Sequence, residues 1–214
     1  ITDPTRFIQG AHQHLGPTWR AEFGPAHDFP HSRRRVGLLF DSTRYGATAT
    51  RLHPQPGTNG PGRPVLEVRL EPTHDRGTSL RVFVVHLKSG GDSTETRTRQ
   101  LRALTSAVRK AVASSDEIVV LGDFNSTGET DRANLALFAA NTGLEWATEE
   151  LTCTAYWKPQ GKCTGSALDH VFTSKSPRAA TARGPCETEG CEPGDACPVF
   201  FDLVSDHCPV TASF

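Results

Sequence analysis

The chain has 214 residues, no methionine and a formal net charge of −1 at pH 7. This length suffices for one large domain with its own core, and we expect residues 1–214 to form a single domain. No apolar run approaches the length of a membrane span, and Ile1 opens no signal-peptide pattern. We interpret the amino terminus as processed, trimmed or incomplete.

The charges are divided unevenly between the two halves of the chain. Residues 1–110 carry 17 Lys and Arg against 9 Asp and Glu, whereas residues 111–214 carry 6 against 15. A basic half could hold a polyanion, and an acidic half could hold metal ligands. The alternative is that the halves interleave in space, in which case the division has no functional meaning.

Short apolar runs predict the first strands of the chain. We expect strands over residues 36–40, 65–70 and 80–87, and a loop over the Pro- and Gly-rich residues 53–64. A helix is expected over residues 95–113, because four apolar residues recur there at helical spacing. They are Leu101, Leu104, Val108 and Val112.

The second half of the chain repeats this mixture of elements. The apolar run that opens residues 118–125 predicts a buried strand, and a helix over residues 132–141 is closed by Gly143. Further strands are expected over residues 168–173 and 209–214, with a loop over 184–198. Strands outnumber helices and several have no helix between them, which favours an α+β fold of packed sheets with helices outside.

All six cysteines lie after residue 150, in sequence with the composition of loops: Cys153, Cys163, Cys186, Cys191, Cys197 and Cys208. An even number of clustered cysteines predicts disulfides and a secreted, extracellular or periplasmic protein. Spacing does not fix the connectivity; we expect Cys153–Cys163 across a hairpin and two disulfides among the other four. A zinc site is the alternative, although the paired C-x₂-C spacing is missing.

Six polar residues stand beside the apolar strands: His86, Asp123, Asn125, Asp169, Asp206 and His207. Asp123 and Asn125 are two positions apart, so at a strand end their side chains would point to the same side. Carboxylate and amide oxygens suit Mg²⁺, Mn²⁺ or Ca²⁺, and histidines act as acids, bases or phosphate donors near neutral pH. Together these residues predict a site for a hard cation or a phosphate.

Each of these residues also has an ordinary structural explanation. Residues 122–125, Gly-Asp-Phe-Asn, suit a turn, because Asp and Asn adopt turn backbones readily. A histidine at the end of a strand, such as His86, is commonly a surface or hydrogen-bonded residue. Asp169 lies inside a strand and needs a partner if it is buried.

Five short motifs occur in the order typical of one known group of enzymes: His86-Leu-Lys-Ser89, Arg99-Gln100, Gly122-Asp-Phe-Asn125, Leu168-Asp-His-Val171 and Ser205-Asp-His207. From about residue 35 to residue 214 the chain therefore resembles the endonuclease/exonuclease/phosphatase superfamily. That superfamily includes pancreatic-type deoxyribonucleases, abasic-site endonucleases, bacterial sphingomyelinases and inositol polyphosphate phosphatases.

The resemblance implies a four-layer sandwich, with two packed mixed β-sheets and helices outside. It also implies hydrolysis of a phosphoester with Mg²⁺, or alternatively Mn²⁺ or Ca²⁺. Catalytic roles fall on five residues: His86, Asp123, Asn125, Asp169 and His207. The metal region falls on Asp206 and Asp123, and substrate binding on Asn125, Lys88 and Arg99.

The roles implied for these residues are those of a phosphoester hydrolase. Asp123 would orient or deprotonate the attacking water, and Asn125 would contact the phosphate. Asp169 would hold the His207 imidazole in the useful tautomer while His207 faces the phosphate. His86 would donate to the phosphoryl oxygens or the leaving group.

The chain departs from the family pattern at its amino terminus. The family begins with a strand carrying Asn, followed by a strand ending in Gln-Glu whose Glu is the principal metal ligand. Here Gln9 is followed by Gly10, and Glu22 does not end an apolar strand. We expect two amino-terminal strands to be missing and the metal site to be incomplete, unless an upstream segment or a second chain completes it.

The function favoured by the sequence is that of a secreted, metal-dependent nuclease acting on DNA. The first alternative is a lipid phosphodiesterase of the sphingomyelinase kind, which requires exposed aromatic or apolar loops. Tyr156-Trp157 is the only candidate for such a loop, and we expect this Trp to be buried. The second alternative is a non-catalytic fragment or subunit that keeps the fold and binds a partner.

Overall fold

The computed structural model describes residues 1–26, 34–59, 61–74, 77–114, 116–158 and 161–214. A six-stranded mixed sheet forms its centre, with the strands in the order β3-β4-β5-β6-β10-β7. Their bounds are β3 Tyr45–Pro56, β4 Pro61–Pro72, β5 Leu80–His86, β6 Glu117–Asp123, β7 Glu145–Trp146 and β10 Asp169–Thr173. Strands β5 and β6 run parallel and their neighbours antiparallel, which confirms the predicted α+β class.

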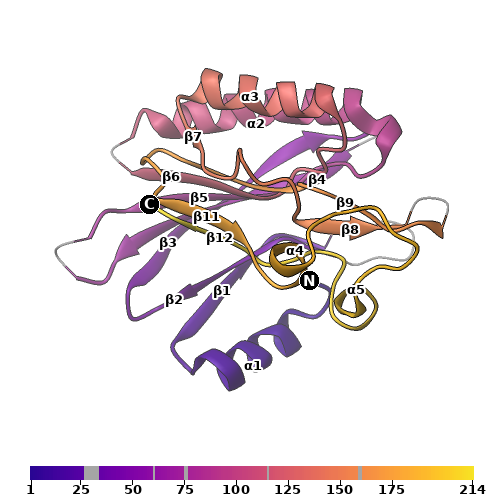
Figure 1. Ribbon diagram of the computed structural model, residues 1–214. Helices are drawn as coiled ribbons and strands as arrows, with labels where there is room; N and C mark the ends of the chain where they lie inside the picture. Colours follow the sequence, from indigo (N-terminus) through magenta and orange to yellow (C-terminus); the bar gives the residue numbers. More distant parts are fainter. Residues whose placement is uncertain (27–33, 60, 75–76, 115, 159–160) are drawn as a thin grey trace.

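Two long helices cover one face of this sheet (Figure 1): α2 (Thr94–Val112) and α3 (Glu129–Thr142). Leu104 and Val108 of α2 and Phe83 of β5 belong to the same core cluster, and all three side chains are fully buried. Helix α3 ends as predicted at Gly143, whose left-handed φ of 70° lets its N–H bond the Ala139 carbonyl. None of the helices in these ranges is long and apolar enough to cross a membrane.

The other face of the sheet packs against two separate two-stranded ladders: β1 (Trp19–Phe23) with β2 (Gly37–Asp41), and β11 (Ala179–Ala182) with β12 (Val210–Ser213). Phe40 of β2 and Phe214 beyond β12 both join the apolar cluster formed by this face. Helix α1 (Pro4–Leu15) lies outside β1, where Phe7 contacts Phe23 edge to face. The layers follow the expected sandwich, but the described residues form two ladders in place of a continuous second sheet.

A disulfide-rich segment closes one end of the molecule, with the elements β8 (Ala155–Trp157), β9 (Thr164–Ser166), α4 (Pro185–Thr188) and α5 (Val199–Leu203). The disulfides are Cys153–Cys191, Cys163–Cys197 and Cys186–Cys208. The expected Cys153–Cys163 pair is wrong, because β8 and β9 pair Ala155 with Ser166 and so place these cysteines at opposite ends of the hairpin. All six cysteines are paired, which leaves no thiolate for zinc.

The predicted loop over residues 53–64 is also wrong, since β3 and β4 continue through most of it as a long antiparallel ribbon. Proline is tolerated in this ribbon because β3 is the edge strand and β5 pairs only with residues 66–70 of β4. The prolines at both ends therefore face no second neighbouring strand. The ribbon extends past the end of β5 and forms a wall beside the site described next.

Candidate active site

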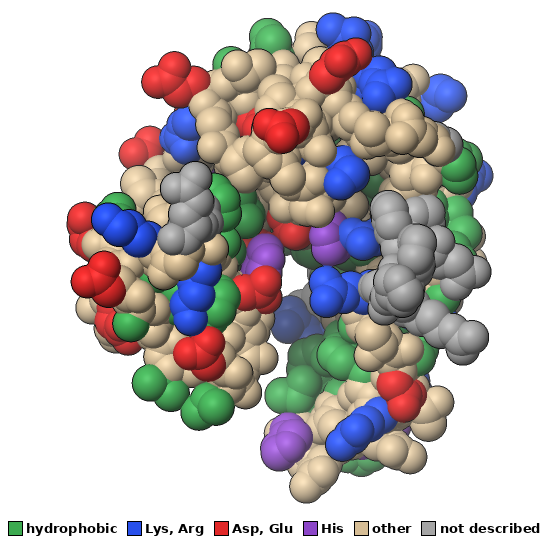
Figure 2. All heavy atoms as spheres, turned by 90° about the vertical axis from the view of Figure 1, so that its right-hand side faces the viewer, with side chains coloured by type: hydrophobic (Ala, Val, Ile, Leu, Met, Phe, Trp, Pro, Cys, Tyr) green, Lys and Arg blue, Asp and Glu red, His purple; other side chains and the backbone are tan. Residues whose placement is uncertain are grey.

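Three adjacent strands bring chemically active side chains to one end of the central sheet. The parallel register of β5 and β6 pairs His86 with Asp123, and the antiparallel register of β10 and β6 pairs Asp169 with Asp123. His86, Asp123 and Asp169 therefore lie side by side, although they are far apart in sequence. Figure 2 shows histidine and acidic side chains together in a hollow on this face of the molecule.

The Gly122–Asn125 segment is both a turn and part of this cluster. Gly122 has a φ of 135°, and a Cβ there would lie 2.1 Å from the Val85 carbonyl oxygen, so only glycine fits. Asn125 has a φ of 52°, and its backbone N–H donates to Asp123 Oδ1 at 2.8 Å. Its side-chain Nδ2 donates to Asp123 Oδ2 at 2.9 Å and to the Leu87 carbonyl at 3.1 Å. Asn125 thus fixes the orientation of the Asp123 carboxylate.

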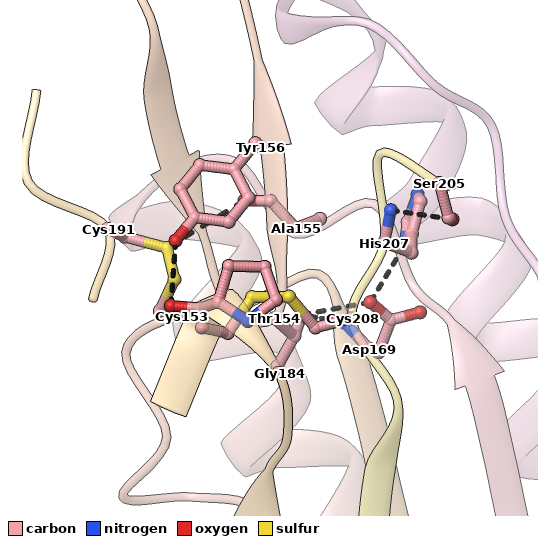
Figure 3. Close-up of a disulfide and its surroundings, with 12 residues drawn as sticks. Cys153, Thr154, Ala155, Tyr156, Asp169, Gly184, Cys191, Ser205, His207 and Cys208 are labelled. Atoms are coloured by element: carbon pink, nitrogen blue, oxygen red, sulfur yellow. Dashed lines mark hydrogen bonds and ion pairs between the residues drawn. A yellow bond between two sulfur atoms is a disulfide. The ribbon is translucent and has the colours of Figure 1, made fainter. Parts of the chain in front are cut away.

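Asp169 at the start of β10 forms a hydrogen bond with His207, which lies in the loop before β12 (Figure 3). Its Nδ1 lies 2.8 Å from Asp169 Oδ2, and the same oxygen accepts a 2.9 Å hydrogen bond from the buried Thr154 hydroxyl. Because Asp169 only accepts, Nδ1 carries a proton and Nε2 faces the Asp123 carboxylate, 3.9 Å from Oδ2. The bond to Asp169 raises the pKa of His207 to about 9, so the imidazolium is the neutral-pH form.

Burial is the main cause of the pKa shifts of Asp123 and His86. Burial, followed by the charge of Asp169, raises the pKa of Asp123 to about 6, so this carboxylate is still ionised at neutral pH. Burial, followed by the charge of Arg63, lowers the pKa of His86 to about 3, which keeps that imidazole neutral. His86 Nε2 lies 3.4 Å from Asp123 Oδ2. One carboxylate therefore faces one imidazolium and one neutral imidazole, a set suited to acid–base chemistry.

The disulfide-rich segment positions the loop that carries His207. The Tyr156 N–H donates to the Asp206 carbonyl and the Cys208 N–H to the Thr154 carbonyl, each at 2.8 Å, so the loop runs as an isolated bridge along β8. Cys208, the residue after His207, is covalently bonded to Cys186 of α4. The location of His207 therefore depends on elements far from it in sequence.

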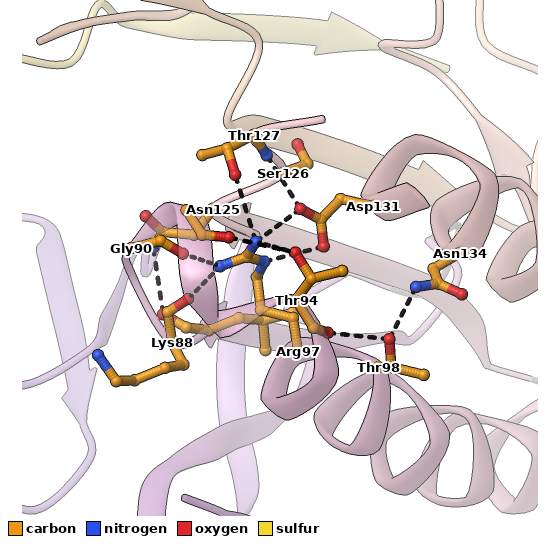
Figure 4. A network of polar contacts seen from close by, with 12 residues as sticks. Lys88, Gly90, Thr94, Arg97, Thr98, Asn125, Ser126, Thr127, Asp131 and Asn134 are labelled. Carbon is orange, nitrogen blue, oxygen red and sulfur yellow. Dashed lines mark hydrogen bonds and ion pairs between the residues drawn. The ribbon is translucent and has the colours of Figure 1, made fainter. Parts of the chain in front are cut away.

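A buried ion pair ties together the two loops that follow β5 and β6 (Figure 4). Arg97, 1% exposed, donates to Asp131 from Nε at 2.9 Å and from Nη2 at 2.6 Å. Its Nη1 donates to the carbonyls of Lys88 at 3.0 Å and Gly90 at 2.7 Å, and Asp131 accepts the N–H of Thr127 at 3.2 Å. The loops after His86 and after Asn125 are thus fixed to the same guanidinium–carboxylate pair.

The sequence patterns gave Arg97 no role in the candidate site. A usable signal was present: Arg97 is four residues before Leu101, on the same helical stripe as the apolar residues that face the sheet. Thr154 was also missed, and here no local signal exists. Its hydroxyl meets Asp169 only through the long-range pairing of the disulfide-rich segment with β10.

The remaining predicted site residues lie at different distances from the cluster. The Lys88 N–H donates to Gln100 Oε1 at 2.9 Å, and Lys88 lines a cavity next to His86. Arg99 is exposed on α2, where its Nη2 contacts the Gly57 carbonyl at 3.4 Å and Thr96 Oγ1 at 3.3 Å. Neither of these Arg99 contacts involves the cluster around Asp123.

The described residues alone do not form a complete metal site. No group of three or more His, Cys, Asp or Glu within them is arranged to hold a metal ion. Asp123 already accepts hydrogen bonds from Asn125 on both of its oxygens, and Asp206 is exposed. A hard divalent cation needs more oxygen ligands than these two carboxylates present.

The chain belongs to the endonuclease/exonuclease/phosphatase family, whose model matches residues 8–207. Enzymes of this family hydrolyse phosphoester bonds and typically depend on a divalent metal. This match confirms the family that the sequence was predicted to resemble. A comparison with curated protein sequences found no match.

Solved structures of several other proteins share the fold. The human Nocturnin catalytic domain with bound sulfate matches with a TM-score of 0.64 and 18% identity, covering 96% of this chain and 76% of that one. D. rerio TDP2 complexed with a single-strand DNA product matches with a TM-score of 0.68 and 16% identity, and the match covers 96% of this chain and 80% of that one. The Bacteroides thetaiotaomicron mannosyl-6-phosphatase Bt3783 matches with a TM-score of 0.65 and 14% identity, and the match covers 98% of this chain and 82% of that one. At these identities the matches show the fold alone.

Proposed function

We propose that this protein hydrolyses phosphodiester bonds, with DNA as the first candidate substrate. The observation that carries the proposal is the meeting of the Asp123 carboxylate, the Asp169–His207 pair and His86 at one end of the sheet. The family's phosphoester chemistry fits this set of groups. DNA is favoured because basic side chains border the hollow in Figure 2 and because the TDP2 neighbour holds a DNA product.

In the proposed reaction Asp123 accepts a proton from the attacking water as the new oxygen–phosphorus bond forms. The leaving oxygen departs with the bonding electron pair on the opposite side of the phosphorus and takes a proton from solvent water. The imidazolium of His207, oriented by Asp169, stabilises the negative charge that develops on the phosphoryl oxygens. His86, neutral at its depressed pKa, donates its N–H to a phosphoryl oxygen or to the leaving group.

A divalent cation is part of this function, Mg²⁺ with Mn²⁺ and Ca²⁺ as alternatives, in keeping with the family's typical metal dependence. Asp123 and Asp206 would supply only part of its ligands, so we propose that a segment outside this sequence or a second chain supplies the rest. The ladders β1–β2 and β11–β12 lie in one layer, and their outer strands pair with no further strand among the described residues. Added strands could pair along those edges.

Cleavage of plasmid DNA with Mg²⁺ or Mn²⁺ tests the proposed substrate. Asp123→Ala and His207→Ala should each lower the rate by about 100-fold or more, because the first removes the base and the second removes the imidazolium that stabilises the developing charge. Arg109→Gln, at an exposed site in the last turn of α2, is the matched control and should cleave normally. Intact plasmid after treatment with folded, metal-loaded protein would exclude the nuclease and favour a non-catalytic subunit or another substrate.

A lipid phosphodiester is the second candidate, favoured by exposed apolar side chains on the disulfide-rich segment. The expectation that Trp157 is buried is wrong: it is 43% exposed, because Tyr156 takes the inward position on β8. Val199, Leu203 and Val204 at α5 are 70% exposed or more. Release of phosphocholine from sphingomyelin vesicles, reduced in Trp157→Ser and Leu203→Ser, would support this substrate in place of DNA.

We also propose that the protein is secreted, since three cysteine pairs at disulfide distance are compatible with an extracellular or oxidising compartment. Disulfides persist in such compartments and are rare in a reducing cytosol. Mass mapping of the protein from culture medium under non-reducing conditions should find the three bonds. Free thiols in that material would contradict secretion as an oxidised protein.

A further inference from the structure

A cavity of about 570 Å³ opens beside the catalytic cluster, and His86 lies in the wall between the two. Residues 57–59, residues 61–63 at the start of β4, the loop after β5 and Gln100 of α2 form its other walls. Its charged lining residues within the described ranges are all basic: Arg34, Arg63 and Lys88. The positive charge is therefore concentrated on one side of the site, next to His86.

Among the described residues, no carboxylate pairs with any of these three cations. The Nε of Arg63 is buried without a hydrogen-bond partner there, and Lys88 Nζ donates only to the Ser89 carbonyl, at 2.9 Å. A buried N–H donor without an acceptor, such as the Arg63 Nε, is costly, and an anion in the cavity would offset that cost.

The frame of the cavity is fixed by Gln100. Its Oε1 accepts the Lys88 N–H and its Nε2 donates to the Pro56 carbonyl, each at 2.9 Å, so one buried side chain joins two walls. Gly62 packs so closely on this bridge that a Cβ would lie 2.8 Å from Gln100 Nε2. The cavity is thus a built feature of the fold and not a gap between loose side chains.

We propose that this cavity binds a second phosphate group of the substrate, next to the phosphate that is hydrolysed. This site rests on the proposed function, because it places the hydrolysed phosphate at Asp123 and His207. His86 borders both compartments, so the second phosphate belongs to the same substrate molecule. It is either the neighbouring phosphate of a nucleic acid strand or the terminal phosphate of a small bisphosphorylated substrate.

Calorimetric binding of two small probes tests this second phosphate site. Deoxythymidine 3′,5′-bisphosphate should bind at least tenfold more tightly than deoxythymidine 5′-monophosphate. Arg34→Gln and Arg63→Gln should each reduce that preference to less than threefold, whereas the control Arg109→Gln should keep it. Arg34 is exposed, so its variant is expected to fold even where Arg63→Gln does not. No preference in the unmodified protein, or an undiminished preference in Arg34→Gln, overturns the proposal.

Oligonucleotides of different length, with and without a 5′-phosphate, distinguish the two sources of the second phosphate. If it is a neighbouring phosphate in a strand, affinity rises with oligonucleotide length and its salt dependence weakens in Arg34→Gln by about one counterion. If it is terminal, only 5′-phosphorylation of a short oligonucleotide raises affinity. Binding requires no turnover, so hydrolysis without the probe preference overturns the second site alone, and the preference without hydrolysis overturns the proposed function alone.

Discussion

At the scale of single residues, the site depends on upward pKa shifts of two neighbouring groups of opposite charge, the Asp123 carboxylate and the His207 imidazolium. Asp123 is raised to a pKa of about 6 by burial, and His207 is raised to a pKa of about 9 by its bond to Asp169. The carboxylate forms as pH rises through the first value, and the imidazolium is lost as pH rises through the second. Between these two pKa values, the ionised Asp123 carboxylate and the His207 imidazolium are both present.

The rate of hydrolysis should therefore rise through about pH 6 and fall through about pH 9. In Asp169→Asn the alkaline limb should move down toward the ordinary histidine pKa of about 6.5, because the group that raises it is gone. Asp202→Asn, on exposed α5, is the control. An alkaline limb that stays near its original pH in Asp169→Asn would contradict the assigned pair.

Residue-scale prediction from the sequence succeeded where a motif is local. Asp123 and Asn125 stand two positions apart and contact each other directly, and Asp169 and His207 form the pair that the family resemblance implies. Their meeting with His86 depends on strand register, which periodicity alone cannot give. Arg63 carries no local signal at all, because its importance comes from the cavity around it.

At the scale of elements, the Arg97–Asp131 pair joins α2 and α3 to both active-site loops. Arg97→Leu leaves a carboxylate that is 4% exposed without its partner, so the free energy of unfolding should fall by about 3–5 kcal/mol. Arg102→Leu, on the exposed side of the same helix, should change it by less than about 0.5 kcal/mol. Urea denaturation measures both, and equal effects would contradict the role given to Arg97.

The Cys186–Cys208 disulfide holds the loop of His207 and closes a sequence separation of 22 residues. Replacing both cysteines by serine should lower stability by about 3 kcal/mol and reduce kcat, because His207 loses its anchor. The matched control is the double serine variant of Cys163–Cys197, with a separation of 34. This control variant should lose a similar amount of stability but retain a higher kcat than the Cys186–Cys208 variant. A lower kcat in the control variant would show that the Cys186–Cys208 disulfide does not position His207 for catalysis.

The sequence patterns missed several elements, among them helix α1 and the β3–β4 ribbon. Helix α1 has clear end signals, with Pro4 in its first turn and an Asp3 side chain that accepts the Arg6 N–H at 3.0 Å. Its apolar residues Phe7, Ile8, Ala11 and Leu15 also recur at helical spacing, so the sequence carried a usable signal for this helix. The β3–β4 ribbon was hidden by its prolines, which only an edge location makes compatible with a strand.

At the scale of the whole molecule, layers and disulfides combine distant segments into one site. The α+β sandwich could be predicted from element order and family motifs, because both are properties of the linear sequence. The disulfide connectivity could not, since it depends on how β8 and β9 pair and on where α4 lies. The proposed metal site also belongs to this scale, because the described residues alone do not complete it.

Metal dependence should therefore separate catalysis from folding. Removal of divalent cations with EDTA should abolish hydrolysis and change the melting temperature little, because the core clusters and disulfides do not involve the proposed metal residues. Readdition of Mg²⁺ or Mn²⁺ should restore activity. Full activity in EDTA, with metal content confirmed as negligible, would exclude the metal.

The most direct test of the central claim is turnover of a chromogenic phosphodiester, bis(p-nitrophenyl) phosphate, by folded protein with Mg²⁺ at neutral pH. This substrate needs neither a nucleic acid nor a lipid surface, so it reports the chemistry of the cluster alone. We expect metal-dependent release of p-nitrophenol that falls about 100-fold or more in Asp123→Asn and in His207→Gln. Release that is unchanged in both variants, each shown to be folded, would contradict the assignment of this cluster as the hydrolytic site.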